Sequence, residues 1–185
     1  KWSAEIQDPG RIPELVSQAF HVATSGRPGP VVLSLPEDML RELSGVGDAK
    51  AYRGVQAHPG PDDMAQLREM LAAAKRPVMM LGGGTWTPKA VADITAFAEA
   101  NNLPVSCAFR NQDRFDNYHE NYVGEVGIGS NPALIARLKE TDLLLAVGPR
   151  LGEQTTQGYS LLDIPVPQLP MVHIHPDAGE LGRVY

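Results

Sequence analysis

A run of three glycines, Gly82 to Gly84, follows the apolar segment Val78–Leu81 and precedes a stretch with helical periodicity. Glycines let a ligand approach the backbone closely, and free N–H groups at a helix start attract negative charge. The run could therefore bind a phosphate. It is not a full dinucleotide fingerprint, because Thr87 stands where the third glycine of G-x-G-x-x-G is expected and no acid ends the next predicted strand. The pattern disfavours classical NAD binding, and a tight turn without a ligand remains an open alternative.

An arginine follows the most apolar segment of the chain, the run from Asp142 to Gly148. Arg150 comes two residues after that run, and residues just beyond the carboxyl ends of parallel strands line the ligand crevice of open α/β sheets. A guanidinium suits a phosphate or a carboxylate. The alternative is an internal ion pair with an acid such as Glu153 or Asp177.

Two histidines alternate in the last apolar segment, "MVHIH", and therefore face the same side of a strand. His173 and His175 have no third ligand at metal-binding spacing, so a metal site is disfavoured. His175 and Asp177 are instead predicted to lie at the rim of the crevice, where an acid could meet a ribose.

Another glycine-rich stretch, "YVGEVGIGSNPA", precedes a predicted short helix. Its glycines, Gly124, Gly127 and Gly129, predict a second loop rich in N–H groups at the same end of the sheet. A flexible connection capped by Asn131 is an equally open interpretation.

The sequence lacks common catalytic motifs: G-x-S-x-G, HExxH and the P-loop lysine are absent. Cys107 lies in an apolar segment, where a thiol is usually inert packing. A net charge of −6 and a pI of about 5.3 argue against nucleic acid or an anionic membrane as a partner. A single cysteine fits a reducing compartment, so we expect a cytoplasmic protein. No catalytic residue is predicted within the chain.

Alternating helical and apolar segments must position these groups. The periodicity predicts helices from Ile12, Asp62, Pro88 and Asn131, and strands near residues 31–35, 78–81, 103–109, 142–148 and 171–175. Fully apolar strands that alternate with helices predict an α/β fold with a Rossmann-like parallel sheet and helices on both faces. Residues 43–60 lack a period and are rich in Gly and Pro, which predicts a linker.

These segments resemble the thiamine-diphosphate-dependent enzymes of the acetolactate synthase and benzoylformate decarboxylase superfamily. "ATSGRPGPVVLSLPEDML" is similar to the end of that family's pyrimidine-binding domain. "AKRPVMMLGGGTWTPKAVADITAFAEANNLPV", "TDLLLAVGPRLGEQTTQGY" and "VHIHPDAGELGRVY" are similar to its central domain. The resemblance implies that residues 1–42 are the tail of the first domain and that residues 61–185 form a central Rossmann-like domain, with truncation of that domain at its C-terminus left as an open alternative.

The resemblance implies a fragment of a carboligase or decarboxylase that uses thiamine diphosphate and Mg²⁺ on a small 2-oxo acid. The full-length enzyme would be a homodimer or homotetramer. The family's catalytic glutamate and its Gly-Asp-Gly motif are expected upstream and downstream of this piece, so we expect the fragment alone to be inactive and not to bind thiamine diphosphate. The rival hypothesis is a stand-alone regulatory domain that binds an adenine nucleotide.

Some members of the family hold FAD or ADP in the central domain. Matched by position, the cofactor-binding residues would be Arg53, Gly82, Gly83, Gly84, Gly124, Gly148, Arg150, His175 and Asp177. The sequence departs from the flavin-binding pattern, because the bulky and charged "FRNQDRFD" replaces a small, glycine-rich stretch and His175 replaces an acid. An empty site or an adenine nucleotide is therefore expected ahead of FAD.

Overall fold

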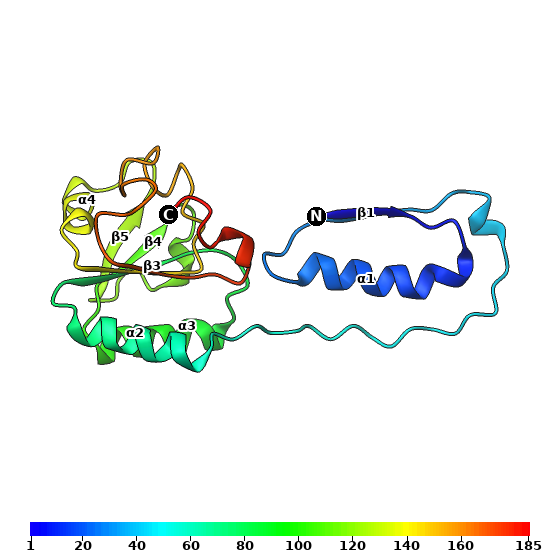
Figure 1. Cartoon of the computed structure of the whole chain (residues 1–185), viewed down its shortest axis with the longest axis horizontal. Helices are drawn as coiled ribbons and strands as arrows, with labels where there is room; N and C mark the ends of the chain where they lie inside the picture. The colour runs from blue at the N-terminus through cyan, green and yellow to red at the C-terminus, as the bar shows by residue number, and fades with distance from the viewer. The chain divides into compact units, whose positions relative to one another are not determined.

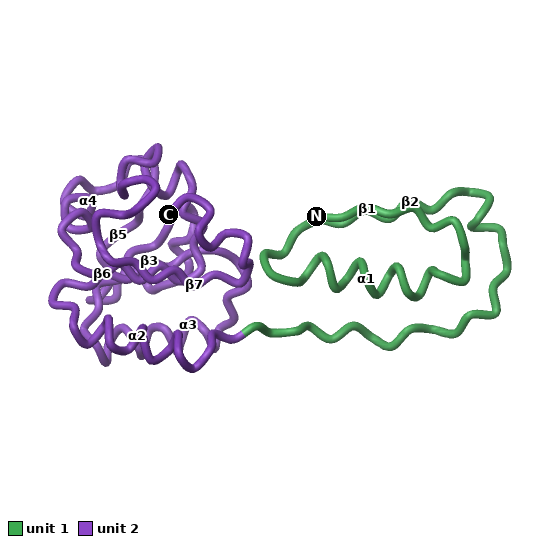
Figure 2. Tube along the Cα trace, in the orientation of Figure 1, with its two compact units in different colours: residues 1–57 green, residues 58–185 purple.

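The computed structural model describes residues 1–185, which divide into two compact units, Lys1–Ala57 and His58–Tyr185 (Figure 2). Unit 1 contains β1 (Trp2–Glu5), α1 (Ile12–Thr24) and β2 (Val31–Ser34). Unit 2 contains α2 (Pro61–Ala73), β3 (Pro77–Leu81), α3 (Pro88–Ala100), β4 (Val105–Ala108), β5 (Tyr122–Val126), α4 (Pro132–Lys139), β6 (Leu143–Val147) and β7 (Met171–Ile174).

Unit 1 is a small β–α–β arrangement. Its two strands pair in parallel, and α1 returns the chain between them (Figure 1). Its buried core is small and consists of Ile6, Leu15 and Met39. The sequence predicted a buried strand at 31–35, but β2 alternates between half-buried and exposed residues, and Val32 is 61% exposed. The prediction of a buried strand is wrong because only one face of this two-stranded sheet is covered, by α1.

Unit 2 is built on one parallel sheet with the strand order β5-β4-β3-β6-β7. The order runs outward in both directions from β3, which is the doubly wound arrangement of Rossmann-type folds. The predicted parallel α/β fold is therefore confirmed. β5 was not predicted, because its sequence YVGEV carries a glycine and was interpreted as part of a loop.

Successive residues of β3 point to opposite faces of this sheet, as a strand requires. Met79 and Leu81 join one buried cluster with side chains of α2 and α3, such as Leu67 and Phe97. The other face packs against α4 and the loop between β6 and β7, in a cluster of Val78, Met80, Ala108, Val126, Leu134, Leu138, Leu144, Ala146, Leu151, Leu161, Leu162 and Leu169. Burial on both faces explains why β3, β4 and β6 read as continuous apolar runs.

The starts of two helices in unit 2 follow the capping pattern that the sequence predicted. The Thr87 hydroxyl accepts the Ala90 N–H, and Asn131 caps α4 in the same way through its side-chain oxygen. A proline follows each cap at the first helical position.

No helix of the chain is long and apolar enough to cross a membrane.

Candidate functional site at the carboxyl edge of the sheet

The predicted crevice lies where the strand order reverses, between the loops that follow β3 and β6. Gly82 and Gly83 come directly after β3, and Gly148 and Arg150 come directly after β6. The Gly82 N–H donates to the Val147 carbonyl at 3.1 Å, so the two loops stay paired beyond the strands. The structure therefore brings the glycine run and the Gly-x-Arg segment together at one edge, as the sequence predicted.

The glycines at this crevice are required by contact between two backbones. A Cβ atom on Gly83 would fall on the Gly148 carbonyl oxygen, and one on Gly148 would fall on the Gly82 carbonyl oxygen. Both residues also have positive φ, +76° at Gly83 and +83° at Gly148. A Cβ on Gly82 would lie 2.7 Å from Cβ of Pro149. The close approach of the loop after β6 thus requires glycine at these positions, whether or not a ligand binds.

Two side chains that were not predicted from the sequence donate hydrogen bonds to carbonyl groups of the glycine run. The Trp86 indole Nε1–H donates to the Gly82 carbonyl at 2.8 Å, and the Arg114 Nε–H donates to the Gly83 carbonyl at 3.2 Å. Arg114 comes from the charged segment after β4 that breaks the flavin-binding pattern. Only Gly84 stays open, with no atom within 4 Å of a Cβ built there.

The start of α3 offers few free N–H groups to an anion. Pro88 has no N–H, and the Ala90 and Val91 amides already donate to the side chain and the carbonyl of Thr87. This leaves the Lys89 amide as the one N–H of the first turn that is available to a ligand. A dinucleotide loop normally presents several such groups to the pyrophosphate.

The second glycine-rich stretch is also satisfied internally. The Ser130 hydroxyl accepts the Gly127 N–H at 2.7 Å and donates to the Gly127 carbonyl at 2.8 Å, which closes the loop before α4. Gly124 was predicted to lie in this loop, but it lies inside β5 beside Ser106 of β4, at an irregularity in the strand pairing. Its placement in the loop is wrong because β5 extends to Val126.

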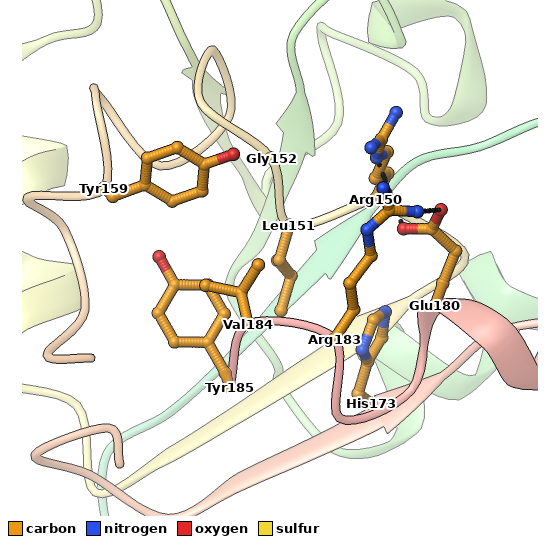
Figure 3. A pocket seen from close by; sticks show the side chains of 9 residues that line it. All are labelled: Arg150, Leu151, Gly152, Tyr159, His173, Glu180, Arg183, Val184 and Tyr185. Carbon is orange, nitrogen blue, oxygen red and sulfur yellow. Dashed lines mark hydrogen bonds and ion pairs between the residues drawn. The ribbon is translucent and has the colours of Figure 1, made fainter. Parts of the chain in front are cut away.

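Arg150 forms an ion pair, although with an acid that the sequence did not predict. Its Nε lies 3.3 Å from a carboxylate oxygen of Glu180, and Arg183 reaches the other oxygen at 3.2 Å (Figure 3). The Glu180 side chain is only 7% exposed, whereas both arginines are about half exposed. A signal was available in the sequence, since Glu180 and Arg183 have the i,i+3 spacing of a local charge pair.

A cavity of about 100 Å³ lies beside this ion-pair cluster. Figure 3 shows Tyr159 and Tyr185 on the side of the cavity opposite the Arg150–Glu180–Arg183 cluster, with Leu151 between. The Tyr185 hydroxyl is buried and has no hydrogen-bond partner. This volume lies below the roughly 300–1,000 Å³ that is typical of small-molecule sites.

His173 lies in β7 and His175 directly after it, and their ring centroids are 5.7 Å apart. The His173 Nε2 lies 2.9 Å from the Pro149 carbonyl oxygen, which makes this nitrogen the donor. Burial lowers the pKa of His173, and the hydrogen bond to Pro149 opposes this only in part. His173 is therefore a neutral structural donor that ties β7 to the loop after β6.

His175 and Asp177 interact with their own turn. The His175 Nδ1 accepts the Asp177 N–H at 3.1 Å, and an Asp177 carboxylate oxygen accepts the Gly179 N–H at 3.0 Å. Asp177 thus caps the short 3-10 helix Ala178–Glu180. Arg53, the remaining predicted residue, is exposed and belongs to unit 1.

Cys107 is fully buried in β4. Burial raises the pKa of its thiol to about 12, with the nearby Asp113 as a further cause. The thiol therefore stays protonated at neutral pH and cannot act as a nucleophile.

The strand order defines a doubly wound α/β domain with glycine-containing loops at its carboxyl edge. Residues 64–185 match the model of the thiamine pyrophosphate enzyme central domain. The chain belongs to the thiamine pyrophosphate enzyme family, and this part of it is the family's central domain.

The similarity to individual relatives supports the same family assignment. The chain is 31% identical to the acetolactate synthase large subunit of Corynebacterium glutamicum over 184 residues, which cover 97% of this chain and 29% of the relative. It is 29% identical to the acetolactate synthase isozyme 2 large subunit of Escherichia coli, over 100% of this chain and 33% of the relative. The structure of the thiamine diphosphate-dependent 4-hydroxybenzoylformate decarboxylase of Rhodococcus jostii RHA1 superposes with a TM-score of 0.71 at 27% identity, over 99% of this chain and 35% of that one. The chain therefore spans about a third of the length of these relatives.

The packed loops leave limited room for FAD or ADP at the carboxyl edge. Diphosphate binding needs open glycines and free amides. Here Gly82 and Gly83 are packed against the loop after β6, whereas Gly84 is open. The Arg150 guanidinium beside the cavity is paired with Glu180 through its Nε and stays about half exposed.

Proposed function

We propose that this chain is the structural middle part of a thiamine-diphosphate-dependent carboligase or decarboxylase that acts on a small 2-oxo acid. In this proposal residues 1–42 are the tail of the pyrimidine-binding domain, 43–60 the linker and 61–185 the central domain. The observation that carries the proposal is the similarity of nearly the whole chain, both to acetolactate synthases and to a 4-hydroxybenzoylformate decarboxylase. Their common chemistry, as their names give it, acts on small carbonyl acids.

Thiamine diphosphate, held with Mg²⁺ by other parts of the protein, would supply the electron sink for cleavage next to the 2-oxo carbon. The residues described here would contribute position and rigidity. The fully apolar strands β3, β4 and β6 give a stiff sheet, and His173 and Glu180 tie its carboxyl-edge loops together. We further propose that the full-length protein assembles as a homodimer or homotetramer.

A stand-alone module that binds an adenine nucleotide is the second candidate. The observation that favours it is the pair of guanidinium groups, Arg150 and Arg183, beside a cavity at the carboxyl edge. The scaffold proposal is preferred, because one buried carboxylate already lies between these two arginines and the glycine run is closed.

An activity assay separates the proposals. The longer protein that contains this sequence is expected to release CO2 from pyruvate or an aromatic 2-oxo acid only when thiamine diphosphate and Mg²⁺ are added. The 185-residue chain is expected to show no turnover under the same conditions. Turnover by the short chain would overturn the scaffold role. A longer protein that is inactive on a panel of 2-oxo acids with the cofactor bound would overturn the proposed reaction.

A further inference from the structure

A groove of about 640 Å³ lies between α2 and α3, on the face of the sheet that these helices cover. Pro77, at the start of β3, and Leu103, just before β4, form its end, so it lies at the amino edge of the sheet. Figure 1 shows the two helices running next to each other below the sheet. The groove is thus at the opposite edge from the glycine loops.

The floor of the groove is apolar and only half covered. Leu67, Leu71 and Phe97 line it and are half-buried, while Met64 is 47% exposed. No residue of α2 is fully buried, although the helix has thirteen residues. The volume lies in the range of roughly 300–1,000 Å³ that is typical of small-molecule sites.

The polar rim of the groove carries positive charge only. Arg68 and Lys75 line it together with the amides of Asn101 and Asn102, and no acidic residue does. Neither the Arg68 guanidinium nor the Lys75 ammonium takes part in an ion pair, although the chain as a whole carries a charge of −6. Two unpaired cations beside an apolar floor complement a ligand with an anionic head and an apolar body.

The ends of α2 and α3 would oppose this charge, because a helix C-terminus is partly negative. Some of their last carbonyls are already bonded, mainly those of α3. The Phe97 carbonyl accepts both the N–H and the side-chain amide of Asn101, and the Met70 carbonyl accepts the Ala74 N–H. One carboxylate also lies close to the groove, since Asp142 accepts the N–H groups of Lys75 and Arg76. The two cations of the rim outweigh this carboxylate and the remaining dipole.

We propose that the α2–α3 groove binds a small amphiphilic anion, such as a medium-chain or aryl-alkyl carboxylate. The carboxylate lies between Arg68 and Lys75, and the apolar body lies against Leu71 and Phe97. This site is independent of the proposed cofactor chemistry and of the closed loops at the carboxyl edge.

The test titrates the 185-residue chain with sodium decanoate, followed by calorimetry and by the amide NMR signals. Decanoate is expected to bind with a Kd of roughly 0.1–1 mM for its twelve heavy atoms. Signals of Arg68, Phe97 and Asn101 should shift, while those of Gly82 to Gly84 should not. Each added CH2 from octanoate to decanoate should lower the Kd roughly fourfold. Decylamine, which carries the opposite charge on the same chain length, should bind at least tenfold more weakly.

Variants separate the two parts of the site. Arg68→Gln with Lys75→Gln should raise the Kd of decanoate roughly fivefold, as expected for exposed charge pairs, whereas Lys50→Gln with Lys139→Gln, which removes the same charge elsewhere, should not. Ala72→Trp places a ring in the groove from an exposed position and should abolish binding without unfolding the helix.

Three results would overturn the proposal: no decanoate binding at 5 mM, equal binding of decylamine, or unchanged binding in Ala72→Trp. Any of these would mean that the stems of Arg68 and Lys75 merely cover the apolar floor.

Discussion

The two edges of the five-stranded sheet differ in how completely the protein satisfies them. At the carboxyl edge, where a doubly wound fold usually binds its ligand, Gly83 and Gly148 are in backbone contact and Trp86 bonds the Gly82 carbonyl. At the amino edge, the groove between α2 and α3 stays open, and its two cations have no partner. A glycine loop therefore does not by itself indicate a ligand. Ligand binding depends on whether the amides of the loop and the space next to them are still available.

The glycine contact should give the largest effect. Gly83→Ala places a methyl group on the Gly148 carbonyl and imposes a positive φ on alanine. The free energy of unfolding should fall by about 3 kcal/mol or more, since strain and steric overlap add. Urea unfolding, followed by the NMR signals of the five-stranded sheet, measures this change.

Gly84→Ala is the matched control, because a Cβ there meets no atom and φ is not in the left-handed region. Its effect should stay within about 0.5 kcal/mol. Equal losses of unfolding free energy in Gly83→Ala and Gly84→Ala would contradict the difference between the two positions, since the run would then be an ordinary flexible loop.

The ion-pair cluster at the carboxyl edge should give the next largest effect. Glu180→Gln keeps the shape of a buried side chain but removes the charge that two half-exposed arginines share. The free energy of unfolding should fall by about 1–2 kcal/mol, less than for a fully buried pair because water screens the arginines. Urea unfolding at two salt concentrations tests this.

Glu140→Gln is its control, since Glu140 forms an exposed pair with Arg76. That substitution should change the unfolding free energy by no more than about 0.5 kcal/mol. If both glutamines cost the same, Glu180 is an ordinary surface residue and the edge is less closed than described.

Trp86→Phe sharpens the comparison further. It removes the indole N–H that donates to the Gly82 carbonyl but keeps an aromatic ring in the partly buried position. A loss of about 1 kcal/mol is expected for one hydrogen bond. Amide exchange at Gly83 should also become faster, because the loop is held less firmly. Unchanged exchange would show that the indole does not secure the loop.

The smallest effect concerns the amino edge, where Asp142 accepts the N–H groups of Lys75 and Arg76 at 2.7 and 2.8 Å. These bonds lower the pKa of the Asp142 carboxyl. A lowered carboxyl pKa adds stability that is present above the unfolded-state value of roughly 3.9 and is lost as the pH falls through the folded value.

Asp142→Asn should therefore lower the thermal midpoint at pH 7 and reduce its fall between pH 5 and pH 3. Asp48→Asn in the linker should leave that acid limb unchanged. Thermal unfolding across this pH range checks both variants, and parallel curves for Asp142→Asn and the parent protein would contradict the assigned role.

The sequence predicted the sheet well, because strands buried on both faces leave continuous apolar runs such as Leu143–Val147. The starts of α3 and α4 could also be predicted, since Thr87 and Asn131 each precede a proline. β1 and β5 were missed. β1 alternates between half-buried and exposed residues, and Gly124 interrupts the pattern of β5.

The state of the crevice could not be predicted from the sequence. The glycine run and Arg150 were placed at the correct edge, but whether they are free depends on residues far away in the chain. Arg114 reaches the Gly83 carbonyl across 31 residues, and Glu180 reaches Arg150 across a loop and a strand. Periodicity and local motifs carry no information about such pairings, which only the folded sheet creates.

The most direct test of the closed carboxyl edge is calorimetric titration of the 185-residue chain with ADP and with FAD. We predict no saturable heat for either ligand up to 1 mM, and no shift in the NMR signals of Gly83, Gly84 or Arg150. Micromolar binding of either ligand, with shifts at those three residues, would contradict the account and would favour a nucleotide-binding module.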